Sequence, residues 1–144
     1  MSKSVAVQCG DRWFWAYDVS LAILLLEAAG VAGPEPRAME TFAGPIALGA
    51  NSLLDLTGNG YALGLIEEAG RRLRARGVFS RAEANERYVF EGEPYELRHE
   101  QHIDGAVLAD LAEAIGQLVR DELPPPPDAD RHWFFGVEGG PRTL

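Results

Sequence analysis

Apolar residues in this chain form helical stripes and short runs, separated by clusters of glycine and proline. Over residues 104–122, leucine, isoleucine and valine recur every three or four positions, which is the period of an amphipathic helix. Asp104 can accept the free amide hydrogens of the first turn, so we expect it to cap this helix. A second stripe of the same period covers residues 61–76, and we expect Gly77 to end it.

Residues 19–29 are apolar on nearly every side as far as Leu26. A helix of this kind belongs in the centre of a core. Asp18 is expected to cap its start, and Gly30 is expected to end it. The run is far shorter than the roughly 20 residues that a membrane-spanning helix requires, and carboxylates flank it. We therefore expect neither a membrane span nor an export signal here.

Short strands are expected where β-branched and aromatic residues lie between turns. Residues 5–9 indicate a first strand, and residues 133–137 indicate a last one. Residues 88–90 and 95–97 flank Glu-Gly-Glu-Pro at 91–94. This arrangement predicts a β-hairpin with an acidic tip.

Two segments lack a regular apolar pattern. Residues 30–60 contain two Gly-Pro pairs and a Thr-Gly-Asn-Gly turn, so we expect a loop-rich stretch with one short element at 46–48 or 53–56. A loop of that length is either functional or hides a further element. Four consecutive prolines make residues 123–130 an extended connector to the last strand. A serine and a glutamate at 80–83 have the spacing of a capping box, which predicts a short helix.

Together these elements predict an α+β fold. We expect a single domain over residues 1–144, with about three helices packed on a small, mostly antiparallel sheet of about four short strands. The only cysteine, Cys9, cannot form an internal disulfide, so a reducing, cytoplasmic location is expected. The preference for arginine over lysine, with abundant alanine and glycine, indicates a bacterium with a GC-rich genome.

Negative charge is concentrated in the second half of the chain. Residues 1–79 carry eight acidic and seven basic side chains, whereas residues 80–144 carry fourteen acidic and six basic ones, and the net charge is −9. A surface of that sign repels nucleic acid and anionic membranes and attracts basic partners. We expect a basic protein as the partner, with no nucleic acid and no membrane. The one basic run, at 71–76, spreads its arginines around a helix and does not alter this expectation.

His99, His102 and Asp104 have the residue types of a catalytic or metal-binding site. Two histidines and a carboxylate can bind zinc, and a histidine beside a carboxylate can act as a general base. The histidines are three positions apart, however, rather than the four of the best-known zinc helix. The alternative is that they are solvated side chains where a strand meets a helix. We expect no metal and no cofactor.

Aromatic residues gather at 13–17 and 132–135. Tryptophan and tyrosine dominate binding hot spots, but they also fill ordinary cores. Alternation along a strand would turn some of these rings inward and leave others exposed. Trp13 or Trp15, if exposed beside acidic residues, would indicate an interface or a ligand pocket.

The first functional hypothesis is a non-enzymatic module that binds a basic protein through its acidic second half. Carboxylates would speed the encounter, and aromatic side chains would supply affinity. The expected contact residues are Glu91, Glu93, Glu96, Glu100, Trp13 and Trp15. In size and charge the chain resembles small bacterial immunity proteins and inhibitors, which cover the positive active-site region of a toxin or enzyme with carboxylates and aromatic residues.

The alternative is a small-molecule-binding protein or enzyme with an aromatic-lined pocket. His99, His102 and Asp104 would then supply the acid, base or metal-binding groups. Convergence of at least two of these side chains on one enclosed pocket would favour it. Neither the partner, the substrate nor the oligomeric state follows from the sequence.

Overall fold

In the computed structural model, which describes residues 4–47 and 53–144, the chain has a mixed α/β fold. The helices of the described residues are α1 (Asp18–Ala32), α2 (Pro36–Ala47), α3 (Gly60–Arg76), α4 (Arg81–Arg87) and α5 (Gly105–Val119). The strands are β1 (Ser4–Cys9), β2 (Arg12–Tyr17), β3 (Leu53–Asp55), β4 (Val78–Ser80), β5 (Val89–Phe90), β6 (Glu93–Pro94), β7 (His102–Asp104), β8 (Trp133–Phe135) and β9 (Arg142–Thr143). That residues 1–144 form one domain stays a prediction.

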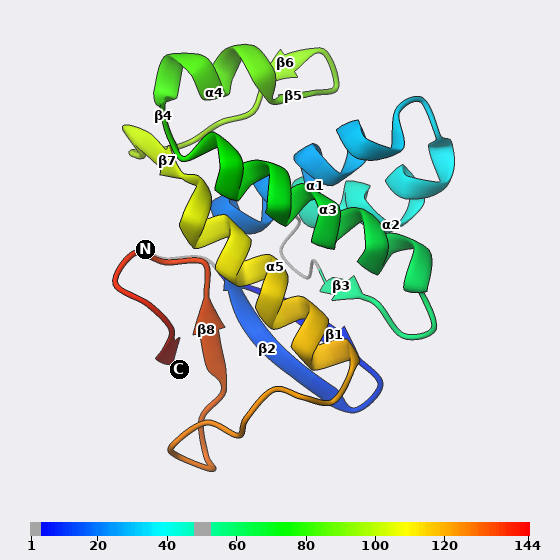
Figure 1. The fold of residues 1–144 in the computed structure, drawn as a ribbon, viewed down its shortest axis with the longest axis vertical. Coiled ribbons are helices and arrows are strands. Elements are labelled where there is room, and N and C mark those ends of the chain that lie inside the picture. Colours follow the sequence, from blue (N-terminus) through cyan, green and yellow to red (C-terminus); the bar gives the residue numbers. More distant parts are fainter. Residues whose placement is uncertain (1–3, 48–52) are drawn as a thin grey trace.

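The largest sheet has five strands in the order β3-β1-β2-β8-β9. β1 and β2 are antiparallel, as are β8 and β9, but β1 pairs with β3 and β2 pairs with β8 in parallel. This sheet is therefore mixed, whereas the strand pairings outside it, β4 with β7 and β5 with β6, are antiparallel as expected. Two small antiparallel sheets, β4-β7 and β5-β6, lie at the opposite end of the molecule, near α4 (Figure 1).

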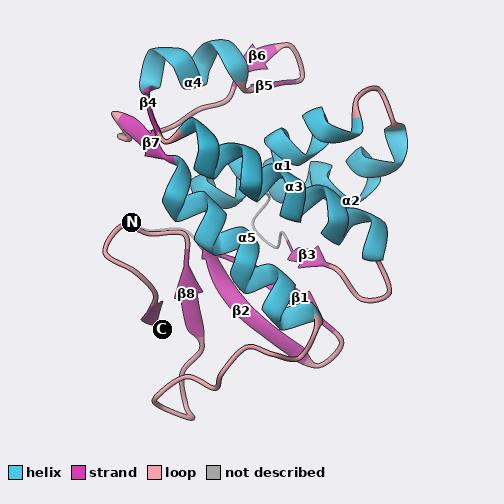
Figure 2. Ribbon diagram, viewed as in Figure 1, coloured by secondary structure: helices cyan, strands magenta, loops and turns pink. Residues whose placement is uncertain are grey.

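One face of the five-stranded sheet forms the floor of the core. Val7 of β1 and Phe14 and Ala16 of β2 point to this face and are fully buried. Trp13 and Trp15 alternate with them and therefore point to the other face, where they are half-buried. α1 and α5 both contact the sheet, and Figure 2 shows α5 running across β1 and β2.

α1 is the central core helix, as its sequence predicts. Its apolar residues from Val19 to Leu25 are almost completely buried. Its ends differ from those expected: the helix continues through Gly30 and ends at Gly33, whose φ of 70° suits a glycine C-cap. No helix among the described residues is long and apolar enough to cross a membrane.

Segment 30–60, expected to be loop-rich, contains α2 and β3. The prolines suggested a loop, but Pro36 occupies the first position of α2, where no intrahelical amide donor is needed. Pro45 lies near the other end of the helix, while Phe42 and Ile46 are buried. The expected elements at 46–48 and 53–56 correspond to the end of α2 and to β3, except that residue 48 lies outside the described residues.

The amphipathic helices were predicted correctly. α3 ends at Gly77, and the side chain of Asp104 accepts the amide hydrogen of Ala106 at the start of α5. Ser80 and Glu83 form the predicted capping box of α4.

The number of strands exceeds the four expected, because several strands span only two or three residues. The hairpin exists, but its strands are β5 and β6, and residues 95–97 are not a strand. β9 lies in the Gly-Gly-Pro tail, β2 in the aromatic cluster, and β8 is shorter than the expected 133–137.

Candidate functional site

Residues 89–94, here called the acidic hairpin, comprise β5, β6 and the two-residue turn between them. Phe90 pairs with Glu93, so Glu91 and Gly92 form the turn itself. Their φ values of 55° and 83° are both positive, as a type I′ hairpin turn requires. The turn holds Glu91 at the tip, and Glu93 is exposed on β6.

The carboxylates of the acidic hairpin are not neutralised by neighbouring arginines. Glu91, Glu93 and Glu96 are all exposed, and within the described residues none of them forms an ion pair. Glu100, the fourth expected contact residue, differs: it is half-buried and accepts a hydrogen bond from Tyr17 with 2.7 Å between the oxygens. Three of the four predicted glutamates are therefore exposed and form no ion pair with another described residue.

A hollow of about 430 Å³, here called the acidic hollow, lies beside the hairpin. The residues that line it come from α1, α2 and the segment that follows α4. They are Asp18, Ile46, Ala47, Phe90, Glu91, Tyr95, Glu96 and Arg98. The hollow thus combines apolar and aromatic walls with three carboxylates and one guanidinium.

Asp18 supplies the buried charge of this hollow and is 1% exposed. It lies in the first turn of α1 rather than at the expected N-cap position, which Tyr17 occupies. One carboxylate oxygen accepts the Val19 amide hydrogen at 2.8 Å and also forms an ion pair with Arg98. A buried carboxylate requires such partners, because burial without them is costly.

Three buried polar atoms that belong to residues lining the acidic hollow have no hydrogen-bond partner in the described part of the chain. They are the second carboxylate oxygen of Asp18, the hydroxyl of Tyr95 and Nε of Arg98. Tyr95 is 8% exposed, and burial, together with the nearby Glu96 carboxylate, raises the pKa of its hydroxyl. The hydroxyl therefore stays protonated at neutral pH. Unsatisfied buried polar groups are uncommon in folded proteins, so three of them around one hollow require an explanation.

A second hollow of about 360 Å³, here called the histidine hollow, lies on the other side of Arg98. His99, His102 and Asp104 all line it, as do Tyr17, Ser20, Glu100, Glu138 and Arg142. The three residues that sequence reasoning grouped as an acid, base or metal site are therefore brought together. The hollow is open to solvent, because the side chain of His99 is 82% exposed and that of His102 is 53% exposed.

Several polar groups of the histidine hollow already have partners, whereas Nε of Arg98, which also lines it, has none in the described residues. His102 lies on β7, which leads into the cap of α5, and its Nε2 is 2.9 Å from a carboxylate oxygen of Glu138. Asp104 caps α5. Within residues 4–47 and 53–144, no group of three or more histidine, cysteine or acidic side chains is placed to hold a metal ion.

Tyr17 connects the histidine hollow to the sheet. Burial raises the pKa of its hydroxyl to about 12, and the hydrogen bond to the Glu100 carboxylate and the charge of that carboxylate add to the effect. Tyr17 therefore donates a proton in this hydrogen bond at neutral pH. Nothing in the sequence pattern indicated this pair, since 83 positions separate the two residues.

Trp13 and Trp15 lie away from the acidic hairpin. Trp13 stacks on His132, with 3.8 Å between the ring centroids, and meets Trp15 edge to face at 4.8 Å. Trp15 pairs in register with Phe134 of β8. The two tryptophans thus belong to the outer face of the five-stranded sheet and do not join the expected glutamates in one surface.

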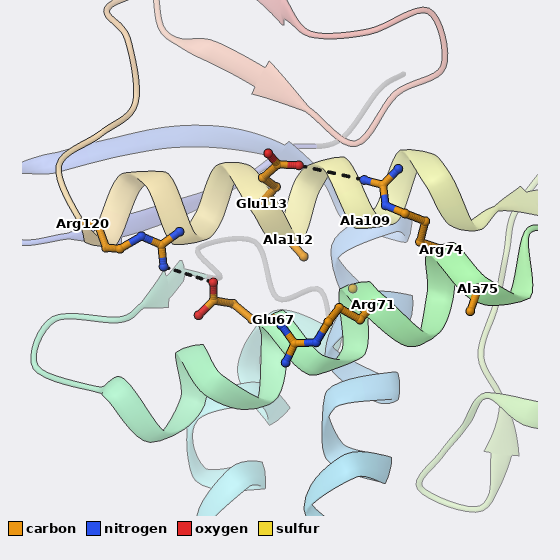
Figure 3. Close-up of a pocket in the computed structure, with 9 residues that line it drawn as sticks. Glu67, Arg71, Arg74, Ala75, Ala109, Ala112, Glu113 and Arg120 are labelled. Atoms are coloured by element: carbon orange, nitrogen blue, oxygen red, sulfur yellow. Dashed lines mark hydrogen bonds and ion pairs between the residues drawn. The ribbon is translucent and has the colours of Figure 1, made fainter.

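A groove of about 430 Å³ between α3 and α5 is lined by Arg71 and Arg74 of the basic run (Figure 3). Gly70, Ala109 and Ala112 line the groove, where the two helices lie close together. Ion pairs cross between the helices: Arg74 binds Asp110 at 2.9 Å, and Arg120 binds Glu67 at 3.1 Å. The charges of this groove are therefore largely paired.

Comparison with protein-family models, with curated proteins and with solved structures finds no match for this chain.

Proposed function

We propose that the protein is a small acidic binding module that docks a basic protein partner on the acidic hairpin and the adjoining acidic hollow. The observation that carries this proposal is the set of exposed carboxylates at Glu91, Glu93 and Glu96, which form no ion pair with any other described residue. Carboxylates gathered in this way accelerate the encounter with a positively charged surface.

The docking surface also contains apolar groups that a partner can bury. Phe90 is half-buried and Tyr95 lines the hollow beside it. Charge at the rim with aromatic groups at the centre is the usual composition of an interface. An immunity or inhibitor protein, which covers the positive site of a toxin or enzyme, requires a surface of this kind. The expected contacts at Trp13 and Trp15 stay a prediction, because they lie on another face.

The proposal is tested first by identifying the partner. Tagged protein is used to capture partners from a lysate of its source, and the complex is washed with increasing salt and analysed by mass spectrometry. A stoichiometric basic protein that dissociates as salt screens the contact is the expected result.

Charge reversal then tests which surface is used. Glu91→Lys with Glu93→Lys is expected to slow association with the captured partner by about tenfold at low salt. Glu122→Lys with Asp130→Lys makes the same change in net charge on an exposed part of the chain outside the hairpin. The control pair should slow association much less. Equal rates for both pairs would reject the acidic hairpin as the docking surface.

The convergence of His99, His102 and Asp104 on the histidine hollow favours a second candidate, a small-molecule-binding protein. Its test is a ligand screen that records the shift in Tm. His102→Ala should abolish the shift caused by a bound ligand, whereas Gln101→Ala, an exposed neighbour, should preserve it. A shift unchanged in His102→Ala would remove the support for this candidate.

A further inference from the structure

We propose that the acidic hollow is a binding site for a single cationic side chain, a lysine or arginine of the partner. The inference rests on the proposed function and adds the chemistry of one subsite. It is carried by two independent observations: the excess of carboxylate around the hollow, and buried polar atoms of its lining residues that have no hydrogen-bond partner among the described residues.

The charge of the hollow selects a cation. Asp18, Glu91 and Glu96 line it, and in the part of the chain that the structure describes Arg98 is the only basic side chain among its lining residues. Arg98 is already engaged with one oxygen of Asp18. The remaining carboxylates therefore favour a further positive group, and the walls exclude part of the solvent that would otherwise screen it.

The unsatisfied atoms specify where the cation binds. The second oxygen of Asp18 can only accept a hydrogen, and a guanidinium or ammonium group supplies hydrogens alone. The hydroxyl oxygen of Tyr95, another residue that lines the hollow, has free lone pairs and can also accept a hydrogen from a cation. A hydrogen bond from a cation to a buried carboxylate is among the stronger ones in proteins.

The walls suit the aliphatic stem of such a side chain. Ile46 and Ala47 provide apolar contact for the stem. Phe90 and Tyr95 provide aromatic rings, whose faces attract a cation. The volume of about 430 Å³ accommodates one long side chain. Nε of Arg98 needs an acceptor instead, which a backbone carbonyl of the bound peptide can supply. This last contact distinguishes a peptide from a free cation.

The test is an NMR titration of the full-length protein with two short capped peptides. One carries a central arginine and the other carries citrulline, which has nearly the same shape but no charge. Ethylguanidinium serves as the free cation. The expected result is a saturable shift of the Phe90, Tyr95 and Glu96 signals with the arginine peptide, and weaker binding of ethylguanidinium.

Variants test whether the hollow itself is responsible. Tyr95→Phe removes the unpartnered hydroxyl, and Glu96→Gln removes a lining carboxylate; each should weaken binding of the arginine peptide by about tenfold. Glu93→Gln is the matched control, because Glu93 is exposed on the same hairpin but does not line the hollow. It should leave affinity within about twofold.

Three outcomes would overturn the proposal. These are the absence of saturable shifts, equal binding of the citrulline peptide, and undiminished affinity in both Tyr95→Phe and Glu96→Gln. Ethylguanidinium that binds as tightly as the peptide would assign the site to a free cation and overturn its assignment to a protein side chain.

The titration separates this proposal from the proposed function. Peptide binding in the hollow, together with association rates that charge reversal of Glu91 and Glu93 leaves unchanged, would uphold the subsite and reject the docking surface. Slowed association without peptide binding would uphold the docking surface and reject the subsite.

Discussion

Tyr88 donates its hydroxyl hydrogen to the carboxylate of Glu27, with 2.8 Å between the oxygens. Glu27 belongs to the apolar helix α1, and its side chain is only 2% exposed. Arg76 and Arg87 bind the same carboxylate at 2.7 and 3.2 Å. One buried charge thus connects α1 with the end of α3 and with α4, the helix that leads into the acidic hairpin.

Removal of that charge should destabilise the protein. Glu27→Gln leaves Arg76 partly buried without its counter-ion, and breaking a buried ion pair costs about 3 kcal/mol. The ion pair with Arg87 contributes less to the loss of stability, because the side chain of Arg87 is 49% exposed. Urea denaturation followed by circular dichroism measures the free energy of unfolding.

Glu113→Gln is the control for this prediction. Glu113 contacts Arg74 at 3.9 Å, and its side chain is 65% exposed. Its loss should change the free energy of unfolding by less than about 0.5 kcal/mol. Equal effects of the two substitutions would show that the Glu27 cluster is not a buried anchor.

Acid should weaken the protein through the same carboxylate. Burial alone would raise the pKa of Glu27, but hydrogen bonds from Arg87, Arg76 and Tyr88 outweigh burial and lower the pKa from 4.5 to about 2. A depressed pKa means that the unfolded chain takes up the proton first as pH falls. The stabilisation is complete above pH 4.5 and should be lost as pH falls towards 2. Unfolding free energies measured across this range should converge for the wild type and Glu27→Gln.

Gly105 should be intolerant of any side chain. A Cβ at this position would meet the backbone carbonyl oxygens of Leu73 and Gly77, and the Gly105 amide donates to the latter at 2.9 Å. Because neither oxygen belongs to a flexible side chain, Gly105→Ala should cost about 3 kcal/mol or more. Gly30→Ala is the contrasting variant: Gly30 is helical with nothing within 4 Å, so alanine should stabilise α1 by about 0.5–1 kcal/mol. Thermal unfolding of both variants measures these two changes in stability.

The hydroxyl of Tyr17 should ionise at a higher pH than an ordinary tyrosine. Burial and the Glu100 carboxylate raise its pKa to about 12, so this contribution to stability is present below pH 10 and is lost as pH rises through about 12. Glu100→Gln removes the negative charge and should lower the pKa of Tyr17. Ultraviolet absorbance of tyrosinate during a pH titration measures the change, with Tyr17→Phe identifying the signal. An identical titration in Glu100→Gln would contradict the role of this carboxylate.

Local chemistry made the helices predictable from the sequence. The caps at Ser80 and Asp104, and the stop at Gly77, act within one turn of their own helix. α2 was not predicted, because proline at its first position has the same local appearance as proline in a loop. Strands of two or three residues contain too few alternations to form a readable pattern.

Parts of the candidate site were predictable for the same reason. Glu91 and Glu93 belong to a hairpin that its own turn residues define, and His99, His102 and Asp104 are near neighbours in the chain. The burial of Asp18 against Arg98 depends on two segments 80 positions apart, so no local pattern shows it. The one available signal for Glu27 was that a single acidic residue follows the apolar run of α1.

The parallel pairing of β2 with β8 affects the order in which the molecule can assemble. Trp15 is in register with Phe134, far along the chain, so this part of the sheet can form only after the segment between them has been synthesised. Until then the edge of β2, which carries two tryptophans, remains open to other strands. Addition of β8 to the sheet is therefore a step at which synthesis, folding and aggregation compete.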